Sequence, residues 1–204
     1  MTNTVEVHRP FAPCVYASKL MFIRERKVPL REELLARRQV DPGQELTSRQ
    51  AWRSSGATLL ESSAALREVG AHVEAVARAA LAPHYGQAAP WEPYVADSWA
   101  VIGARGASHV PHHHGPSPWS GVLYIDVEAA LAERTTPRAG CIEFLSPFAA
   151  SQAFFVPSGA VFQPTDGLML LFPSPLVHLV HPSESDTLRI CIGFDIAVRR
   201  GGAS

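Results

Sequence analysis

The residues best suited to chemistry in this sequence are histidines. Four of them stand in residues 109–115, which read HVPHHHG. Because side chains alternate between the two faces of a β-strand, we expect His112 and His114 to point to one side and His113 to the other. Two imidazoles on one side of a strand can reach the same metal ion, and neutral imidazole is a good ligand for Fe(II), Zn, Cu or Ni.

A second histidine-bearing segment can supply a third ligand. Residues 173–182 read PSPLVHLVHP, and either His178 or His181 can complete the site. Three protein ligands leave metal positions open for substrate and for water or oxygen, as in catalytic rather than structural sites. The alternatives are a solvated histidine-rich loop that binds metal adventitiously and, for His178, an ordinary core histidine. Two such segments, both flanked by predicted strands, favour the metal site.

Length and charge narrow the classes of protein that fit. A chain of 204 residues can bury a real core without metals or disulfides. The net charge of −1 gives no case for a nucleic-acid partner or an acidic membrane surface. Cys14, Cys141 and Cys191 are far apart and odd in number, which suits a reducing cytosol. With no signal peptide and no membrane-spanning run, we expect a cytoplasmic protein without a membrane partner.

The N-terminal part is predicted to be rich in helix. Residues 59–81 carry apolar side chains at intervals of three, four and seven, and alanine dominates the other positions. This pattern predicts a helix that ends near Pro83. A shorter helix is expected to open at Pro29, and an edge strand is expected over residues 11–16.

The remainder of the chain is predicted to be rich in β-structure. Short strands are expected at 94–102, 122–127, 141–145, 153–156, 168–172 and 188–196. A turn is expected at Arg105-Gly106 and a surface loop over residues 128–139. This pattern favours a sandwich or barrel. We expect one domain over residues 1–204, with a helix-rich elaboration (1–93) on a mainly β core (94–198).

Residues 99–194 resemble the 2-oxoglutarate/Fe(II) oxygenases of the double-stranded β-helix, or jelly-roll, superfamily. The shared motifs are Trp99 with Gly106, the histidines at 112–114, SGVLY at 120–124, FPSPLVHLV at 172–180 and RICIGFD at 189–195. The stretch 48–54 around Trp52 is similar to an N-terminal motif of a small bacterial group in that superfamily. Each motif is weak alone, but the combination is specific. The resemblance implies a jelly-roll core with the N-terminal helices packed outside it.

The resemblance also implies Fe(II) as the metal and 2-oxoglutarate as co-substrate. His112 and His178 would be iron ligands, and His114 falls where the wider superfamily usually has a carboxylate. The implied metal ligands are therefore His112, His114 and His178. This choice leaves His181 as a residue of the site's rim.

Three further residues are implied to bind the co-substrate. Arg189 would pair with the distal carboxylate of 2-oxoglutarate, because its planar guanidinium suits bidentate binding. Tyr124 would add a hydrogen bond. Cys191 stands where the family often has a serine near that carboxylate.

The sequence also departs from the family's pattern. The usual facial triad has two histidines and one carboxylate, and an imidazole in the third place leaves one more positive charge on the metal. Asp126 and Glu143 are candidates for a missing carboxylate, although neither has the right spacing. Asp195 stands where the family often has asparagine. His109 and His113 have no assigned role and are expected on the outer face or near the mouth of the site.

These features predict a non-haem Fe(II) oxygenase that couples 2-oxoglutarate decarboxylation to the oxidation, above all hydroxylation, of a C–H bond by O2. The neutral charge favours a small-molecule substrate. Loops on a rigid scaffold usually carry specificity, so Trp52, Trp119 and Arg138 are guesses for substrate contacts.

Two other functions fit the same residues. One is a cupin-like enzyme with a three-histidine metal site, a dioxygenase or isomerase that does not use 2-oxoglutarate, in which Arg189 is structural or binds substrate. The other is a jelly roll that binds metal without catalysis. The sequence leaves the oligomeric state open, with a homodimer as one option.

Overall fold

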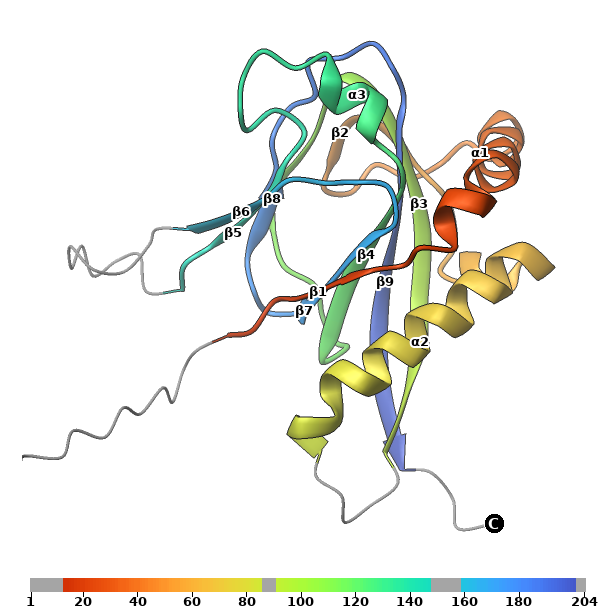
Figure 1. Ribbon diagram of the computed structural model, residues 1–204, viewed down its shortest axis with the longest axis vertical. Coiled ribbons are helices and arrows are strands. Elements are labelled where there is room, and N and C mark those ends of the chain that lie inside the picture. Colours follow the sequence, from red (N-terminus) through yellow and green to blue (C-terminus); the bar gives the residue numbers. More distant parts are fainter. Residues whose placement is uncertain (1–12, 86–90, 148–158, 201–204) are drawn as a thin grey trace, which may run out of the picture.

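The computed structural model describes residues 13–85, 91–147 and 159–200, and within these ranges nine strands form one antiparallel sheet. The strands are β1 (Tyr16–Lys19), β2 (Ser48–Arg53), β3 (Trp91–His112), β4 (Trp119–Asp126), β5 (Ile142–Leu145), β6 (Gly159–Phe162), β7 (Leu168–Pro173), β8 (His178–Val180) and β9 (Arg189–Arg200). Their order is β1-β7-β4-β9-β3-β8-β5-β6, and β2 pairs with β3 beside this path. The sheet curls, with β5, β6 and β8 on one side of β4, β9 and β3 and helices α1 and α2 on the other (Figure 1). The expectation of a mainly β protein is confirmed.

Strand β3 connects the two parts of the curled sheet. Its first half pairs with β9, and its end pairs with β8. Between these regions Gly106 adopts a φ of +80°, a left-handed value that favours glycine, and the register with β2 shifts over the same stretch. The turn predicted at Arg105-Gly106 is therefore wrong. The chain bends at a bulge and continues as a strand to His112.

Helices α1 (Ile23–Val40) and α2 (Ala64–Tyr85) cover the outer face of the sheet, and a 3-10 turn, η1 (Leu59–Glu61), precedes α2. The short helix α3 (Glu128–Ala132) lies apart from them and packs Leu131 against the inner-face core. Apolar side chains of α1 and α2 share one core with outward-facing strand residues; the helical members include Leu30, Leu34, Leu66, Val69, Val73 and Leu81. Burial of this apolar area is the main force that holds the helices on the sheet.

The helix predictions differ from the structure mainly at the ends. The predicted helix at 59–81 is present as η1 followed by α2, which runs past Pro83 to Tyr85. The short helix expected at Pro29 is an 18-residue helix, α1, with Pro29 inside it. Helix α3 forms the beginning of the expected loop at 128–139. No helix in the described ranges combines the length and apolar composition that crossing a membrane requires.

The strand predictions succeed where the strands are apolar. Strands β3, β4, β5, β7 and β9 match five predicted segments to within one residue at the predicted ends or extend beyond them, whereas β2, β6 and β8 are not anticipated. The predicted edge strand overlaps the structure only at Tyr16, where β1 begins, and the predicted strand at 153–156 lies outside the described residues. Because β1 and β2 pair into the sheet, the N-terminal part contributes strands as well as helices.

Candidate active site

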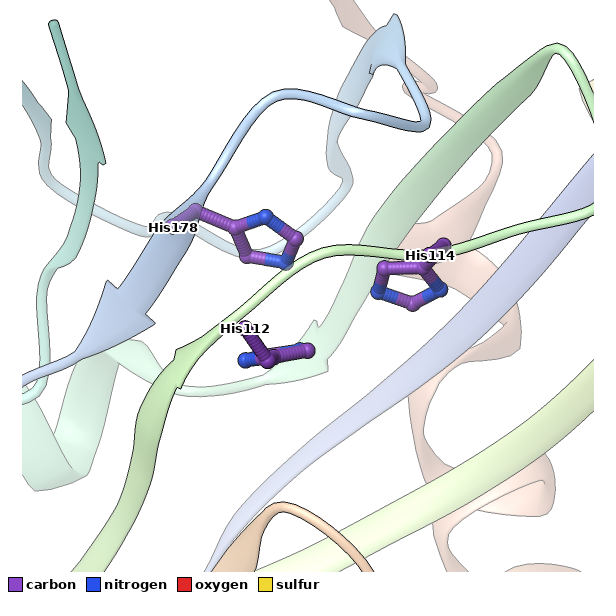
Figure 2. Close-up of side chains that lie close together, drawn as sticks. All are labelled: His112, His114 and His178. Atoms are coloured by element: carbon purple, nitrogen blue, oxygen red, sulfur yellow. The ribbon is translucent and has the colours of Figure 1, made fainter. Parts of the chain in front are cut away.

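Three histidines meet at the point where β3 ends and β8 begins. His112 and His178 are direct cross-strand partners, and His114 follows two residues after His112. One nitrogen from each ring can be chosen so that all three atoms lie within 4.8 Å of one another. Figure 2 shows the three rings facing a common space. The sequence placed His112 and His114 on one side of the chain, and the structure adds the pairing that brings His178 to them.

Hydrogen bonds fix two of these imidazoles in the orientation that a metal requires. Nδ1 of His112 lies 2.8 Å from the carbonyl oxygen of Val110, and Nδ1 of His178 lies 2.9 Å from that of Leu176. A carbonyl oxygen only accepts, so both Nδ1 atoms donate and both Nε2 atoms keep a lone pair. This is the usual outer-shell arrangement of metal-binding histidines, and the residues present therefore fit a metal ion.

Burial keeps the same imidazoles neutral. It lowers the pKa of His178 to about 3, with the neighbouring histidines acting in the same direction. Burial also lowers the pKa of His112, against the opposing effect of its hydrogen bond to Val110. A neutral imidazole offers its lone pair to a metal without first releasing a proton.

The third histidine, His114, is held by a carboxylate. Its Nδ1 lies 3.2 Å from Oδ1 of Asp195, and that same oxygen accepts a 2.6 Å hydrogen bond from Ser120 Oγ. Ser120 in turn contacts Ser174 Oγ at 2.7 Å. The indole of Trp99 stacks on His114 at 5.6 Å between ring centroids. A negative charge thus lies directly behind the imidazole that occupies the usual carboxylate position.

The two other acidic candidates lie elsewhere. Asp126 forms ion pairs with Lys27 at 2.7 Å and Arg31 at 3.0 Å, which attach α1 to the end of β4. Glu143 lies 2.7 Å from Nε2 of His181. Neither belongs to the histidine cluster, so within the described residues Asp195 is the carboxylate next to it.

A cavity of about 480 Å³ opens beside the histidines. Every second residue of the first part of β9 lines this cavity, because side chains alternate between the two faces of a strand. These residues are Arg189, Cys191, Gly193 and Asp195. The remaining residues of this strand segment face the helix-side core. Gly193 leaves room for the indole of Trp99, since a Cβ there would lie 2.5 Å from Trp99 Cε2.

Two polar groups on the cavity wall lack partners. Arg189 is only 8% exposed, yet its side chain makes no hydrogen bond or ion pair with any described residue. The hydroxyl of Tyr124 is buried and has no hydrogen-bond partner there either. Burial raises the pKa of Tyr124 and that of Cys191, its cross-strand neighbour, while the charge of Arg189 opposes both shifts. A buried cation and a buried donor without partners are costly unless a ligand satisfies them, and a carboxylate would satisfy both.

The family comparison covers these same residues. Residues 97–195 match the family described as "Putative 2OG-Fe(II) oxygenase". The matched region, 99 of the 204 residues, has the sequence pattern of the 2-oxoglutarate/Fe(II) oxygenases. The protein is accordingly a 2-oxoglutarate-dependent dioxygenase, with Fe(II) and 2-oxoglutarate as its cofactor and co-substrate. No curated protein matches the chain.

Solved structures of oxygenases have the same fold. A prolyl-4-hydroxylase from Pseudomonas putida superposes with a TM-score of 0.60 at 16% identity, over 92% of this chain and 93% of that one. HygX from Streptomyces hygroscopicus, with nickel, 2-oxoglutarate and hygromycin B bound, superposes with a TM-score of 0.58 at 12% identity, over 90% of this chain and 82% of that one. A prolyl hydroxylase from Trichoplax adhaerens, in complex with a hypoxia inducible factor peptide fragment, superposes with a TM-score of 0.62 at 13% identity, over 91% of this chain and 83% of that one. The likeness confirms the double-stranded β-helix fold for this oxygenase.

The three guessed substrate residues lie away from the cavity of this oxygenase. Trp119 is buried in the helix-side core, where its Nε1 donates to Tyr85 Oη at 2.9 Å. Trp52 Nε1 donates to the carbonyl oxygen of Asp41 at 3.0 Å. Arg138 has a largely exposed side chain that pairs with Glu143. Among the described residues, none of these three guesses lines the cavity that holds the histidines.

Other cavity residues of the oxygenase are missing from the sequence prediction. Arg53 lines the cavity, whereas its neighbour Trp52 does not, since adjacent residues of a strand face opposite ways. Recognition of β2 as a strand would have revealed this alternation. His109 and His113, which were expected on the outer face or near the mouth of the site, both line the cavity, and the ring of His109 stacks on that of His112 at 5.8 Å. Burial and the charge of Arg189 lower the pKa of His109 to about 3.

Proposed function

We propose that this oxygenase hydroxylates a C–H bond of a small molecule, with His112, His114 and His178 as iron ligands and Arg189 as the anchor of 2-oxoglutarate. Held by these residues, Fe(II) would activate O2 as the oxidant, so that one oxygen atom enters the new hydroxyl group, the other enters succinate, and CO2 leaves. The observation that carries the proposal is that the histidine cluster and the unpaired Arg189 line one cavity.

The protein's own side chains then have distinct tasks. Arg189 donates to the distal carboxylate of 2-oxoglutarate, and the hydroxyl of Tyr124 adds a second donor. Cys191 lies between them on the cavity wall. Asp195 holds His114 by its Nδ1 and leaves Nε2 for the metal. This carboxylate offsets part of the charge that an all-histidine triad leaves on the metal.

The size of the cavity supports a small substrate. About 480 Å³ must hold the co-substrate as well as the reacting group. The net charge of −1 gives no electrostatic case for a nucleic-acid substrate. A cytoplasmic location, a single domain and a homodimer remain predictions from the sequence.

An anaerobic titration tests the proposal. The metal-free protein receives Fe(II) and then 2-oxoglutarate, while the visible charge-transfer band of the iron-chelated ketoacid is recorded. We expect the band in the wild type, its loss in His112→Ala and His178→Ala, and a much weaker 2-oxoglutarate affinity in Arg189→Ala.

His181→Ala is the matched control. His181 belongs to the same segment as His178 but contacts Glu143 and does not line the cavity, so its variant should keep the band. If iron binds and no band forms in the wild type, the three-histidine enzyme without 2-oxoglutarate takes the place of this proposal.

A further inference from the structure

The cavity contains two charged side chains that the proposed function does not use. They are Arg53, at the end of β2, and Asp97, on β3. Asp97 is in register with Asp195 of β9, so it lies at the end of the inner face that is farthest from Arg189. Co-substrate and substrate would therefore be bound by charges at different ends of the same cavity.

Arg53 is fixed beside the metal site. Its guanidinium carbon lies 4.4 Å from the centre of the Trp99 ring, and Trp99 stacks on His114. Its hydrogen bond to Oε1 of Gln44 is long, at 3.3 Å, and no described carboxylate lies within ion-pair distance. Burial lowers the pKa of Arg53, although the charges of Asp195 and Asp97 oppose this effect. A half-buried cation without an ion pair is a good site for an anionic group.

Asp97 has the opposite charge and is also without a direct partner. It is partly buried and makes no side-chain hydrogen bond or ion pair with any described residue. It is near enough to Arg53 for their charges to interact but too far for a salt bridge. Two opposite charges that line one cavity without pairing can each take the complementary charge of a ligand.

The wall beside the histidines suits an apolar group. The ring of Phe172 packs against His178 at 4.8 Å and against His114 at 6.4 Å between centroids. Val101 and Val122 line the same cavity. An aliphatic chain that reaches the metal site would therefore lie against hydrocarbon.

We propose that Arg53 and Asp97 bind a free α-amino acid, with its carboxylate on Arg53, its ammonium group on Asp97 and its side chain directed toward the histidines. The inference rests on the proposed function and names its substrate class. The reaction is then hydroxylation of the amino acid's side chain, with 2-oxoglutarate and O2 consumed and succinate and CO2 released.

Binding to a complex that cannot turn over tests this inference. Protein loaded with Ni(II) and 2-oxoglutarate is titrated in a calorimeter with each proteinogenic amino acid, its carboxamide and its N-acetyl form. We expect at least one free amino acid to bind, and both of its derivatives to bind about tenfold or more weakly, because each loses a charge-assisted hydrogen bond.

Two variants test whether Arg53 binds the carboxylate and Asp97 binds the ammonium group of the amino acid. Arg53→Gln should remove the preference for the acid over the amide, and Asp97→Asn should remove the preference for the free amine over the N-acetyl form. Arg49→Gln and Glu92→Gln are the controls. Arg49 is exposed and lies on β2, as Arg53 does. Glu92 lies on β3, as Asp97 does, and pairs with Arg199 of β9. Neither Arg49 nor Glu92 lines the cavity.

The possible outcomes distinguish a failure of the amino-acid proposal from a failure of the proposed oxygenase function. If the Fe(II)/2-oxoglutarate band forms but no free amino acid binds, or the carboxamide and N-acetyl forms bind better than the free amino acid and so indicate a peptide, the inference is overturned and the oxygenase function stands. If the band does not form, the proposed function fails and the inference fails with it. Should Arg53→Gln not fold, the comparison of derivatives on the wild type still decides.

Discussion

The two faces of β9 have opposite compositions. The outer face is apolar and fully buried in the core shared with α1 and α2; its residues are Ile190, Ile192, Phe194 and Ile196. The inner face lines the cavity with charged or small residues, namely Arg189, Cys191, Gly193 and Asp195. Because strand side chains alternate, one segment can stabilise the fold on one face and build the site on the other. Substitutions on the two faces should therefore separate stability from activity.

The largest effect is expected at the metal site. His178→Ala should lower the rate of 2-oxoglutarate-dependent turnover by on the order of 1,000-fold or more, because the bound metal contributes several kcal/mol to catalysis. The free energy of unfolding of the metal-free protein should fall by only about 1–3 kcal/mol, because the variant removes the hydrogen bond from His178 Nδ1 to the carbonyl oxygen of Leu176. Succinate formation and calorimetric unfolding measure the two quantities. Near-normal turnover would remove His178 from the ligand set.

The reverse result is expected on the outer face. Ile192→Ala should lower the free energy of unfolding by about 2–5 kcal/mol, because the side chain is fully buried and leaves a cavity. The folded fraction should bind Fe(II) and 2-oxoglutarate as the wild type does. Urea unfolding measures the free energy of unfolding, and the anaerobic titration measures the binding of Fe(II) and 2-oxoglutarate. Cys191→Ser, on the inner face, is compared with Ile192→Ala in both measurements. Loss of co-substrate binding in folded Ile192→Ala would contradict the separation of the faces.

A smaller effect is expected from Asp195→Asn. The asparagine can keep the contact with His114 but lacks the charge behind it, so metal affinity should fall about 10- to 100-fold. Competition with a coloured chelator measures this affinity. A variant that binds iron as tightly as the wild type would show that the carboxylate only orients the ring.

A further effect concerns the pH dependence of stability. Folding lowers the pKa of His109 and of His178 to about 3, from an ordinary value of 6.5, because burial disfavours the charged form. The unfolded chain therefore takes up protons first as pH falls, and the metal-free protein should lose stability between pH 6.5 and 3, by at most about 1.4 kcal/mol per pH unit for each histidine.

His109→Gln isolates one of these contributions. In this variant the slope of the unfolding free energy against pH should become shallower by up to about 1.4 kcal/mol per pH unit, which corresponds to the uptake of one proton. Urea titrations at several pH values give the slopes. Equal slopes in the wild type and His109→Gln would show that His109 is not held neutral by burial.

Local sequence pattern explains part of what could be predicted. The periodicity of α2 and the apolar strands β4, β7 and β9 reveal the core, and the spacing of His112 and His114 reveals two candidate ligands. The choice of His178 and the proposed roles of Arg189 and Tyr124 came from the resemblance to a family. The structure then brings these residues to one cavity.

The remaining features depend on pairing between distant segments. Strand β8 has three residues and β2 is largely polar, so neither has a clear hydrophobic pattern. Without β2, the alternation that sends Arg53 rather than Trp52 into the cavity could not be recognised. The contact between His114 and Asp195 joins residues 81 positions apart, so no local motif indicates it.

A crystal structure with Ni(II) and 2-oxoglutarate tests the central claim most directly, because it shows which inner-face residues hold each group. The account predicts nickel on His112, His114 and His178, with the distal carboxylate of 2-oxoglutarate on Arg189 and Tyr124. A metal bound elsewhere, or a distal carboxylate on Arg53, would contradict it.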